Sequence, residues 1–299
     1  MNGTPFACPS GQTTCAIPLP EGSGLASYKV DSATGLSASG STFFYLDVTT
    51  PQISGSVNGS IGTTGWYISQ TTFTASTSDA LSGIATFEMN VDNNGWTSYS
   101  DTTFTDGIHS IQYRATDNAG NFTETTSQEI KVDTVAPALN LSTTGTTGQN
   151  GWYVSTVTLT PTASDSGSGL VALEASIDGA PFTNYQSPIT LLDGIHSVQF
   201  RAIDNAGNIS QTVLQEIKVD TVTPGLSLAA NGTIGSNGWY VSNVAVTPNA
   251  LDAGSGINTI EAMIDGGTWS LVNSPLSFSE GMHTYQIKVT DQAGNETVT

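Results

Sequence analysis

Apolar and polar residues alternate along this chain in short stretches, and clusters of turn-forming residues separate the stretches. In residues 134–220 the stretches are about six to nine residues long and are bounded by Gly, Asn, Asp and Ser. No segment repeats its apolar residues at the spacing that is typical of an amphipathic helix. Alternation places apolar side chains on one face of a strand. The pattern therefore predicts an all-β protein.

The same segment predicts individual strands. They include residues 138–144, 152–164, 170–178, 196–204 and 211–220. Asp-Gly pairs between such stretches are signals for tight hairpin turns. We infer seven strands per unit, which is the number in an immunoglobulin-type sandwich. The predicted fold class is thus a tandem array of immunoglobulin-like β-sandwich domains.

The array is indicated by an internal repeat. Trp66, Trp152 and Trp239 lie 86 and 87 residues apart (66 to 152 and 152 to 239), and three His and three Asp residues follow nearly the same spacing. We predict a partial, degenerate unit or N-terminal segment at 1–46. Full repeats follow at 47–133 and 134–220, and a third repeat at 221–299 lacks its last strand.

Acidic residues recur at the predicted domain junctions. An odd number of strands carries the chain from one end of a sandwich to the other, so two loops should meet beside the linker Asp that enters the same unit. The three sets are Asp47, Asp79, Asp117 and Asn121; Asp133, Asp165, Asp204 and Asn208; and Asp220, Asp252, Asp291 and Asn295. Clustered side-chain oxygens favour calcium over zinc. The alternative is that these residues only form turns.

Two other columns of residues repeat with the array. Glu88, Glu174 and Glu261 should face Arg114, Arg201 and Lys288 as cross-strand ion pairs. Trp96 and Trp269, with Phe182 in the same place, follow a hairpin and are candidates for glycan contact. The three histidines fall in different repeats and cannot meet at one ion, so we interpret them as structural.

Charge and composition narrow the functional classes. The chain has 6 basic and 25 acidic residues, a net charge of −19, which argues against nucleic acid and anionic lipid as partners. No apolar run long enough to insert into a membrane is present. Cys8 and Cys15 are expected to form a small disulfide. No nucleophile motif is present, and triplication itself argues against an enzyme.

The motifs "GWY", "DGIHSVQFRAIDNAGN" and "KVDTVAP" occur in order at a fixed period. They resemble the tandem bacterial immunoglobulin-like repeats of secreted and cell-surface proteins, including adhesins and the stalks of exported multidomain enzymes. The resemblance implies an extracellular or cell-surface location. It also implies calcium ligation by the Asp of the "DxAGN" turn together with the linker Asp, pairing Asp117 with Asp47, Asp204 with Asp133 and Asp291 with Asp220.

The leading hypothesis is a non-catalytic stalk or adhesin repeat region, stiffened by calcium, whose partner is a surface receptor or glycan. We expect a monomer that is a segment of a longer chain. The alternative is a glycan-binding accessory module of an exported multidomain hydrolase. A further hypothesis is that residues 41–48 ("STFFYLDV") complete the third repeat of a neighbouring copy by strand addition.

Overall fold

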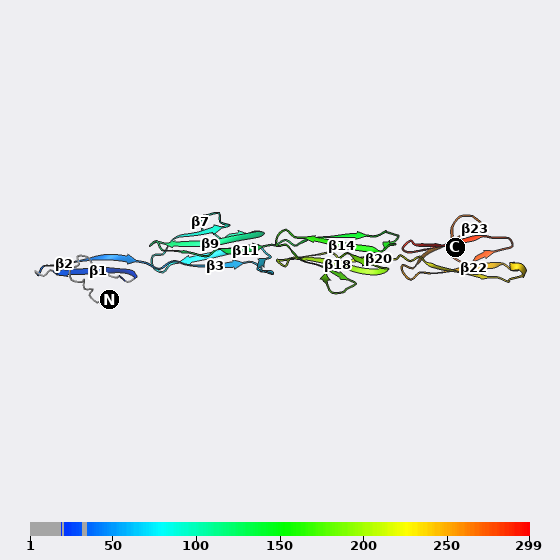
Figure 1. The fold of residues 1–299 in the computed structure, drawn as a ribbon, viewed down its shortest axis with the longest axis horizontal. Coiled ribbons are helices and arrows are strands. Elements are labelled where there is room, and N and C mark those ends of the chain that lie inside the picture. The colour runs from blue at the N-terminus through cyan, green and yellow to red at the C-terminus, as the bar shows by residue number, and fades with distance from the viewer. Residues whose placement is uncertain (1–18, 20, 32–34) are drawn as a thin grey trace. The chain divides into compact units, whose positions relative to one another are not determined.

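The computed structural model describes residues 19, 21–31 and 35–299 (Figure 1). The chain divides into two compact units, Met1–Val135 and Ala136–Thr299. Cys8 and Cys15, and with them the expected disulfide, lie outside the described residues. Among the described residues, no helix has the length and apolar character that a membrane span requires.

The first unit contains a hairpin in which β1 (Gly22–Asp31) pairs with β2 (Ser37–Leu46) over ten positions. A sandwich of two sheets follows. One sheet contains β3 (Gln52–Asn58), β5 (Thr71–Ser78) and β8 (Thr102–Phe104). The other contains, in spatial order, β4 (Trp66–Tyr67), β11 (Gln128–Val132), β9 (Gly107–Asp117), β6 (Ile84–Val91) and β7 (Trp96–Ser98), with β10 (Phe122–Glu124) also on β9.

The second unit contains this sandwich twice. In its first copy, the smaller sheet is β12 (Ala138–Thr144), β14 (Val157–Ser164) and β17 (Ile189–Leu191). The larger sheet is β13 (Trp152–Tyr153), β20 (Gln215–Val219), β18 (Gly194–Asp204), β15 (Leu170–Ile177) and β16 (Thr183–Asn184), with β19 (Ile209–Gln211) on β18.

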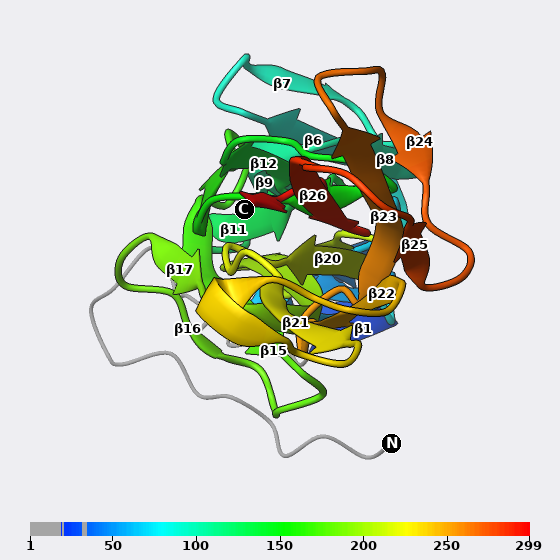
Figure 2. The same ribbon diagram turned by 90° about the vertical axis from the view of Figure 1, so that its right-hand side faces the viewer.

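In the second copy, the smaller sheet is β21 (Gly225–Asn231), β22 (Val244–Leu251) and β25 (Leu276–Phe278). The larger sheet is β24 (Ser270–Leu271), β23 (Ile257–Ile264), β26 (Tyr285–Asp291) and β27 (Glu296–Val298). Figure 2 shows the two layers, with β21 and β22 on one side and β23 and β26 on the other. A short 3₁₀ helix, η1 (Ser236–Gly238), precedes Trp239. The prediction of an all-β class with tandem immunoglobulin-like sandwiches is confirmed.

Alternation along the strands explains the cores. In β18, every second residue from Val198 to Asp204 is buried. Val198 and Phe200 belong to one core cluster with Val157 and Leu159 of β14 from the facing sheet. Phe200 is the largest of them and is fully buried. Its counterpart in the first unit is Tyr113, whose hydroxyl is buried and has no hydrogen-bond partner among the described residues.

The structure corrects the prediction of one strand over residues 152–164. Trp152 and Tyr153 pair in parallel with β20 in the larger sheet, whereas residues 157–164 pair with β12 in the smaller sheet. The chain therefore changes sheets between these two segments, which alternation alone does not reveal. The predicted strand 211–220 is likewise interrupted, because the Thr212 hydroxyl accepts a hydrogen bond from the Phe200 N–H (2.9 Å) between β19 and β20.

The predicted cross-strand ion pairs are confirmed. Glu88 and Arg114 lie directly opposite each other, and the guanidinium donates to one carboxylate oxygen through Nη2 (2.8 Å) and Nε (3.0 Å). The other two pairs occupy the same register, Glu174 with Arg201 and Glu261 with Lys288. These side chains are partly exposed, so the pairs contribute little to stability.

Candidate functional site

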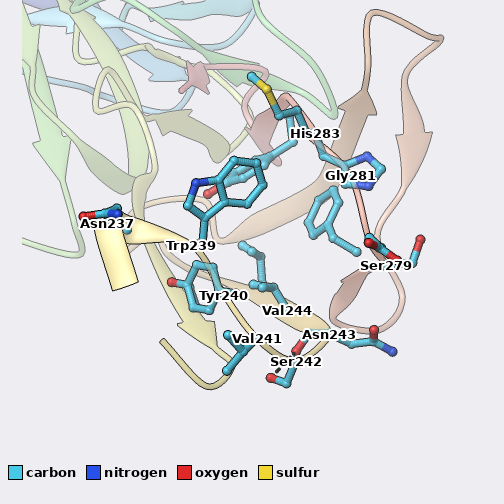
Figure 3. A pocket seen from close by; sticks show the side chains of 17 residues that line it. Asn237, Trp239, Tyr240, Val241, Ser242, Asn243, Val244, Ser279, Gly281 and His283 are labelled. Carbon is cyan, nitrogen blue, oxygen red and sulfur yellow. Dashed lines mark hydrogen bonds between the residues drawn. The ribbon is translucent and has the colours of Figure 1, made fainter. Parts of the chain in front are cut away.

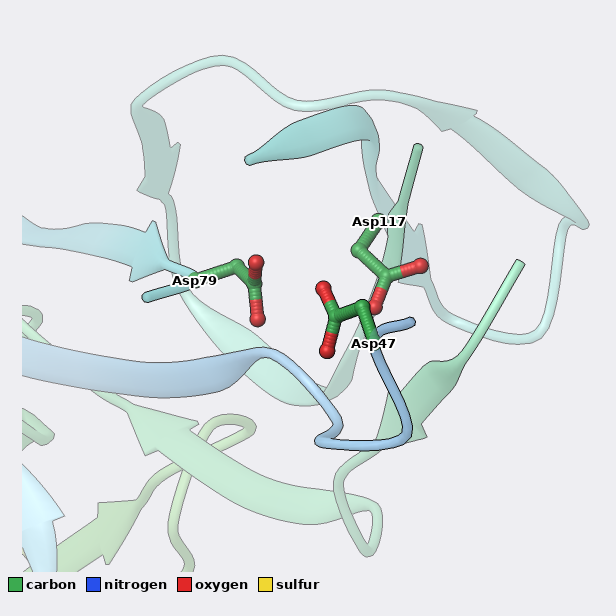
Figure 4. Close-up of side chains that lie close together, drawn as sticks. All are labelled: Asp47, Asp79 and Asp117. Atoms are coloured by element: carbon green, nitrogen blue, oxygen red, sulfur yellow. The ribbon is translucent and has the colours of Figure 1, made fainter. Parts of the chain in front are cut away.

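The first unit brings three predicted acidic residues together. Asp47 lies in the linker after β2, Asp79 follows β5, and Asp117 ends β9. One carboxylate oxygen from each lies within 4.8 Å of the others, and the Asp47 carboxylate lies between the other two (Figure 4). Asp117 is buried, while Asp47 and Asp79 are half-buried. Three segments far apart in sequence therefore converge through side-chain oxygens, as the strand count predicted.

Each of these acids also organises its own backbone. Asp117 accepts hydrogen bonds from the N–H groups of Gly120 (2.7 Å) and Asn121 (2.8 Å), which closes the "DNAGN" turn. Asp79 accepts from the Gly83 N–H (2.9 Å) in the same manner. Asp47 accepts from the Ser82 N–H (2.9 Å), so the linker is tied directly to the loop of the sandwich. Asp79 and Asp117 therefore close their own turns and also belong to the cluster of three carboxylates.

These hydrogen bonds keep two of the acids ionised. Hydrogen bonding from Ser82, followed by that from Thr49, lowers the pKa of Asp47 from its usual 3.8 to about 2 against the opposing effect of desolvation. Burial raises the pKa of Asp117, but hydrogen bonds from Asn121 and Gly120 outweigh it and leave the pKa below its usual value. Both carboxylates are thus negative at neutral pH.

A further oxygen lies beside this cluster. The hydroxyl of Ser82 is buried and contributes to the lowered pKa of Asp47. Its residue is held next to Asp47 by the backbone hydrogen bond. Ser82 Oγ is therefore an additional neutral oxygen at the edge of an anionic site.

The second unit contains an equivalent cluster. Asp220, Asp252 and Asp291 each offer one oxygen within 4.8 Å of the others, and Asp220 and Asp291 are fully buried. The Ser255 N–H donates to Asp220 Oδ2 (2.7 Å). The amide nitrogen of Asn295 donates to Asp291 Oδ2 (2.8 Å) and to the Asp220 carbonyl (3.0 Å). The amide nitrogen of Asn295 therefore links the two acids by hydrogen bonds, and the amide nitrogen of Asn121 donates in the same way to Asp117.

A glycine permits the close approach of the linker acid in this cluster. A Cβ placed on Gly254 would lie 2.5 Å from Cγ of Asp220. No side chain larger than hydrogen fits without displacing the carboxylate. The same loop in the first unit has Leu81 at this position, and that residue is exposed.

The remaining predicted set is divided between the two units. In the first unit, Asp133 is buried, its N–H donates to the Tyr67 carbonyl (2.9 Å), and Oδ1 accepts from Val135. In the second unit, Asp165 accepts from the Gly169 N–H (2.7 Å). Asp204 is fully buried and closes its own turn with Asn208 through N–H (2.8 Å) and amide (2.9 Å) donors.

The candidate glycan-binding aromatics are partly covered. The Arg114 guanidinium lies 4.4 Å from the ring centre of Trp96, and the Lys288 ammonium lies 5.2 Å from that of Trp269. Both indoles are half-buried. The tryptophans of the "GWY" motifs differ from one another, since Trp66 is 9% exposed and Trp239 is 62% exposed.

Sequence reasoning missed a histidine–aspartate pair in each repeat. His109 Nδ1 lies 3.0 Å from Asp92 Oδ2, and its Nε2 lies 3.1 Å from the Thr105 carbonyl. The equivalent pairs are His196 with Asp178 and His283 with Asp265. The signal was available, because each His follows an Asp at an offset of 17 or 18 residues. The histidines join two hairpins, in agreement with a structural role.

Residues 79–134 and 158–221 match a family model described as a bacterial Ig-like domain. The resemblance to bacterial immunoglobulin-like repeats is confirmed for these segments. Comparison with curated proteins finds no significant match.

Several solved structures are similar to this chain. They include fibronectin(III)-like modules of Clostridium thermocellum CbhA, with 13% identity over 56% of this chain and 93% of that chain and a TM-score of 0.28. A tetra-tandem repeat in the extending region of a large adhesion protein has 16% identity over 94% of this chain and 80% of that chain, with a TM-score of 0.30. A structure from a 1.5-MDa bacterial ice-binding adhesin has 16% identity over 85% of this chain and 96% of that chain, with a TM-score of 0.27.

Proposed function

We propose that this chain is a non-catalytic structural repeat region of a bacterial cell-surface or secreted protein, with calcium bound at its junction clusters. The repeats are taken as 47–133, 134–220 and 221–299. The observation that carries the proposal is the convergence of a linker acid with two loop acids inside 4.8 Å, in both clusters that lie within one unit. Turn formation accounts for each acid separately but gives no reason for like charges to meet.

The donor set fits calcium. Three carboxylates and neutral oxygens such as Ser82 Oγ are hard ligands of the kind that this ion prefers. The proposed ligands are Asp47, Asp79 and Asp117; Asp133, Asp165 and Asp204; and Asp220, Asp252 and Asp291. A bound cation would neutralise the mutual repulsion of the acids and connect the linker to both loops.

Such a connection would act between consecutive repeats. Asp220 directly follows β20, the last strand of the repeat at 134–220, whereas Asp252 and Asp291 belong to the next repeat. A cation shared by these residues would restrict bending at the linker. An array that transmits force or projects a binding domain from a cell surface benefits from restricted linkers.

The proposal is tested by isothermal calorimetry and small-angle X-ray scattering of the full chain with calcium and with chelator. We expect saturable calcium binding and a narrower distribution of inter-repeat distances in calcium. Absence of binding at millimolar calcium would refute the cation role and leave these acids as turn formers. Magnesium serves as the matched control ion, because its smaller coordination shell suits this ligand set less well.

The alternative of a glycan-binding accessory module is less well supported. A sugar stacks on an open aromatic face, and the Arg114 and Lys288 cations lie over Trp96 and Trp269. No specific observation favours this function over the structural one. Glycan-array binding that is lost in Trp269→Ala would reverse this preference.

A further inference from the structure

A direct contact joins the second and third repeats, in addition to the linker between them. The loop at residues 146–150 comes from the second repeat and the turn at residues 291–295 comes from the third, and both lie in the second unit. The backbone N–H of Gln149 donates a hydrogen bond to the carbonyl of Ala293 (2.7 Å). These two segments form the loop–turn contact.

A side-chain amide adds to the loop–turn contact. The amide nitrogen of Asn150 donates to the backbone carbonyl of Gln292 (2.9 Å) and to the side-chain oxygen of the same residue (3.1 Å). The amide nitrogen of Gln292 donates to the Ile257 carbonyl of its own repeat (3.4 Å), which leaves the side-chain oxygen to accept from the loop. The loop therefore binds the turn through its backbone and through one side chain.

The space that the turn occupies explains the glycine at position 148. Gly148 is not among the glycines with a positive φ, so its backbone conformation does not require the absence of a side chain. A Cβ at this position would lie 2.2 Å from the carbonyl oxygen of Ala293 and 2.6 Å from Cγ1 of Val154. The nearer of these two atoms belongs to the backbone of the next repeat and cannot rotate away. A side chain at position 148 would therefore force the loop and the turn apart.

The loop is closed by hydrogen bonds within its own repeat. The Gly148 N–H donates to the Trp152 carbonyl (2.8 Å), and the Trp152 N–H donates to the Gln149 carbonyl (2.9 Å). The corresponding loops of the other two repeats are closed by the same pair of hydrogen bonds. Asn150 has a φ of 52°, a conformation that Asn adopts more readily than most residues. The donors are thus already in position, which lowers the entropic cost of the contact.

The turn is covered where the loop meets it. Ala293 is fully buried, whereas Ala119, at the same place in the first unit, is exposed. Both residues lie in a "DxAGN" turn, so the burial depends on the neighbouring segments and not on the turn itself. The same turn contains Asp291, whose Oδ1 accepts from the Gly294 N–H (2.7 Å). The loop of one repeat therefore contacts the turn that holds an acid of the junction cluster.

The linker attaches the same two repeats at another place. On the side of the second repeat, the Asp220 N–H donates to the Tyr153 carbonyl (2.9 Å), and the Thr221 N–H donates to Asp193 (2.8 Å). On the side of the third repeat, the Asp220 carboxylate accepts from the Ser255 N–H (2.7 Å). A single attachment permits rotation about the linker, whereas two attachments at separate positions oppose it.

We propose that the loop–turn contact holds the relative orientation of the second and third repeats without any cation. The loop at 146–150 is a docking surface for the Gln-Ala-Gly backbone of the following repeat, and Asn150 supplies the side chain that recognises it. Calcium at the neighbouring cluster would then stabilise a junction that already has its geometry. The proposal concerns the junction named in the proposed function but does not rest on calcium binding, so either proposal can fail without the other.

Amide hydrogen exchange of the full chain in chelator tests the contact directly. The N–H of Gln149 is bonded to the third repeat. The N–H of Ser236, at the same position in the loop of the third repeat, makes no bond to another repeat within the described residues. We expect the protection factor of Gln149 to exceed that of Ser236 by about tenfold or more. Equal protection of the two amides would overturn the proposal.

Gly148→Ala should remove this protection, because the added Cβ displaces the Ala293 carbonyl. Gly235→Ala is the matched control. Its Cβ would meet Cγ1 of Val241 at 2.6 Å, as that of residue 148 meets Val154, but its three nearest atoms all belong to the third repeat. The control should keep the protection of Gln149. Full protection of Gln149 in Gly148→Ala would contradict the proposed role of the loop.

A second pair of variants decides the question if the alanine disturbs the loop itself. Asn150→Asp replaces the donor amide with a carboxylate that repels both oxygens of Gln292. Asn237→Asp makes the same change in the third repeat, where Figure 3 shows Asn237 just before Trp239. Residual dipolar couplings in chelator should give the same degree of alignment for both repeats in the natural chain and in Asn237→Asp, and different degrees in Asn150→Asp. Different degrees in the natural chain, or equal degrees in Asn150→Asp, would refute the proposal.

Discussion

The substitution Asp220→Asn tests the junction cluster within the second unit. Asp220 is fully buried, and its two oxygens accept from Ser255 (2.7 Å) and Val222 (3.2 Å) N–H groups. Asn has one acceptor oxygen, so one of these N–H groups loses its bond, at a cost of about 1.5–3 kcal/mol. In chelator, relief of repulsion with Asp252 and Asp291 offsets part of this cost.

A comparison with and without calcium separates the loss of a calcium ligand from the loss of a hydrogen bond. At a free concentration of 100 times Kd, a site present only in the folded state contributes about 2.7 kcal/mol. For a domain of this size, 1 kcal/mol corresponds to about 4–8 °C in Tm. Calcium should therefore raise the Tm of the third repeat by about 10–20 °C in the natural chain. Asp220→Asn should lose most of that increment.

The assay is differential scanning calorimetry of both chains in excess calcium and in chelator. Asp193→Asn is the matched control, because Asp193 also accepts from a linker N–H, that of Thr221 (2.8 Å), but lies outside the cluster. Its calcium increment should equal that of the natural chain. An equal increment in Asp220→Asn, or no increment in the natural chain, would refute the reasoning.

Three further outcomes follow from the structure. Tyr113→Phe removes a buried hydroxyl that has no hydrogen-bond partner among the residues the structure describes. It should raise the free energy of unfolding of the first unit by about 1–3 kcal/mol in urea titrations. Gly254→Ala places a Cβ 2.5 Å from Asp220 and should weaken calcium binding in calorimetry, whereas Gly55→Ala, with its nearest contact at 3.6 Å, should not. Asp47 has a lowered pKa in the folded state, so the stability that its carboxylate contributes is complete above pH 3.8 and is lost as pH falls through about 2. Asp47→Asn should therefore reduce the pH dependence of the urea unfolding midpoint across this window.

Much of the fold could be predicted because alternation and turn residues are local signals. The first strand of the second repeat, 138–144, was predicted with the bounds that the structure has. The prediction failed at 152–164, because alternation tells which face of a strand is buried but not which sheet the strand joins. Trp152 and Tyr153 are assigned to the larger sheet by β20, which lies more than sixty residues later in the chain.

The candidate site was predictable to a similar extent. A repeat spacing and an odd strand count were enough to bring Asp47, Asp79 and Asp117 together. The exposure of Trp239, 62% against 9% for Trp66, does not follow from the "GWY" motif, because the motif is the same in every repeat. A residue's burial depends on its partners as well as on its own motif.

The strand that fills one core also positions the acid of the next junction. Val219 ends β20, and the ladder continues for one more residue, because the Asp220 N–H donates to the Tyr153 carbonyl (2.9 Å). The first unit repeats this arrangement with Asp133 and Tyr67. The linker acid is therefore an extension of a buried strand.

This coupling predicts the effect of inserting one Ser between Val219 and Asp220. The strand keeps its core residues, but the acid moves about 3.3 Å along the chain and its side chain turns to the opposite face. The calcium increment in Tm should therefore fall as far as it does in Asp220→Asn, while the Tm of the 134–220 repeat in chelator stays close to that of the natural chain. Insertion of the same Ser in the exposed turn at Asp178-Gly179 should leave the calcium increment unchanged. A full increment after insertion at Asp220 would mean that the loops, and not the strand, determine where the acid lies.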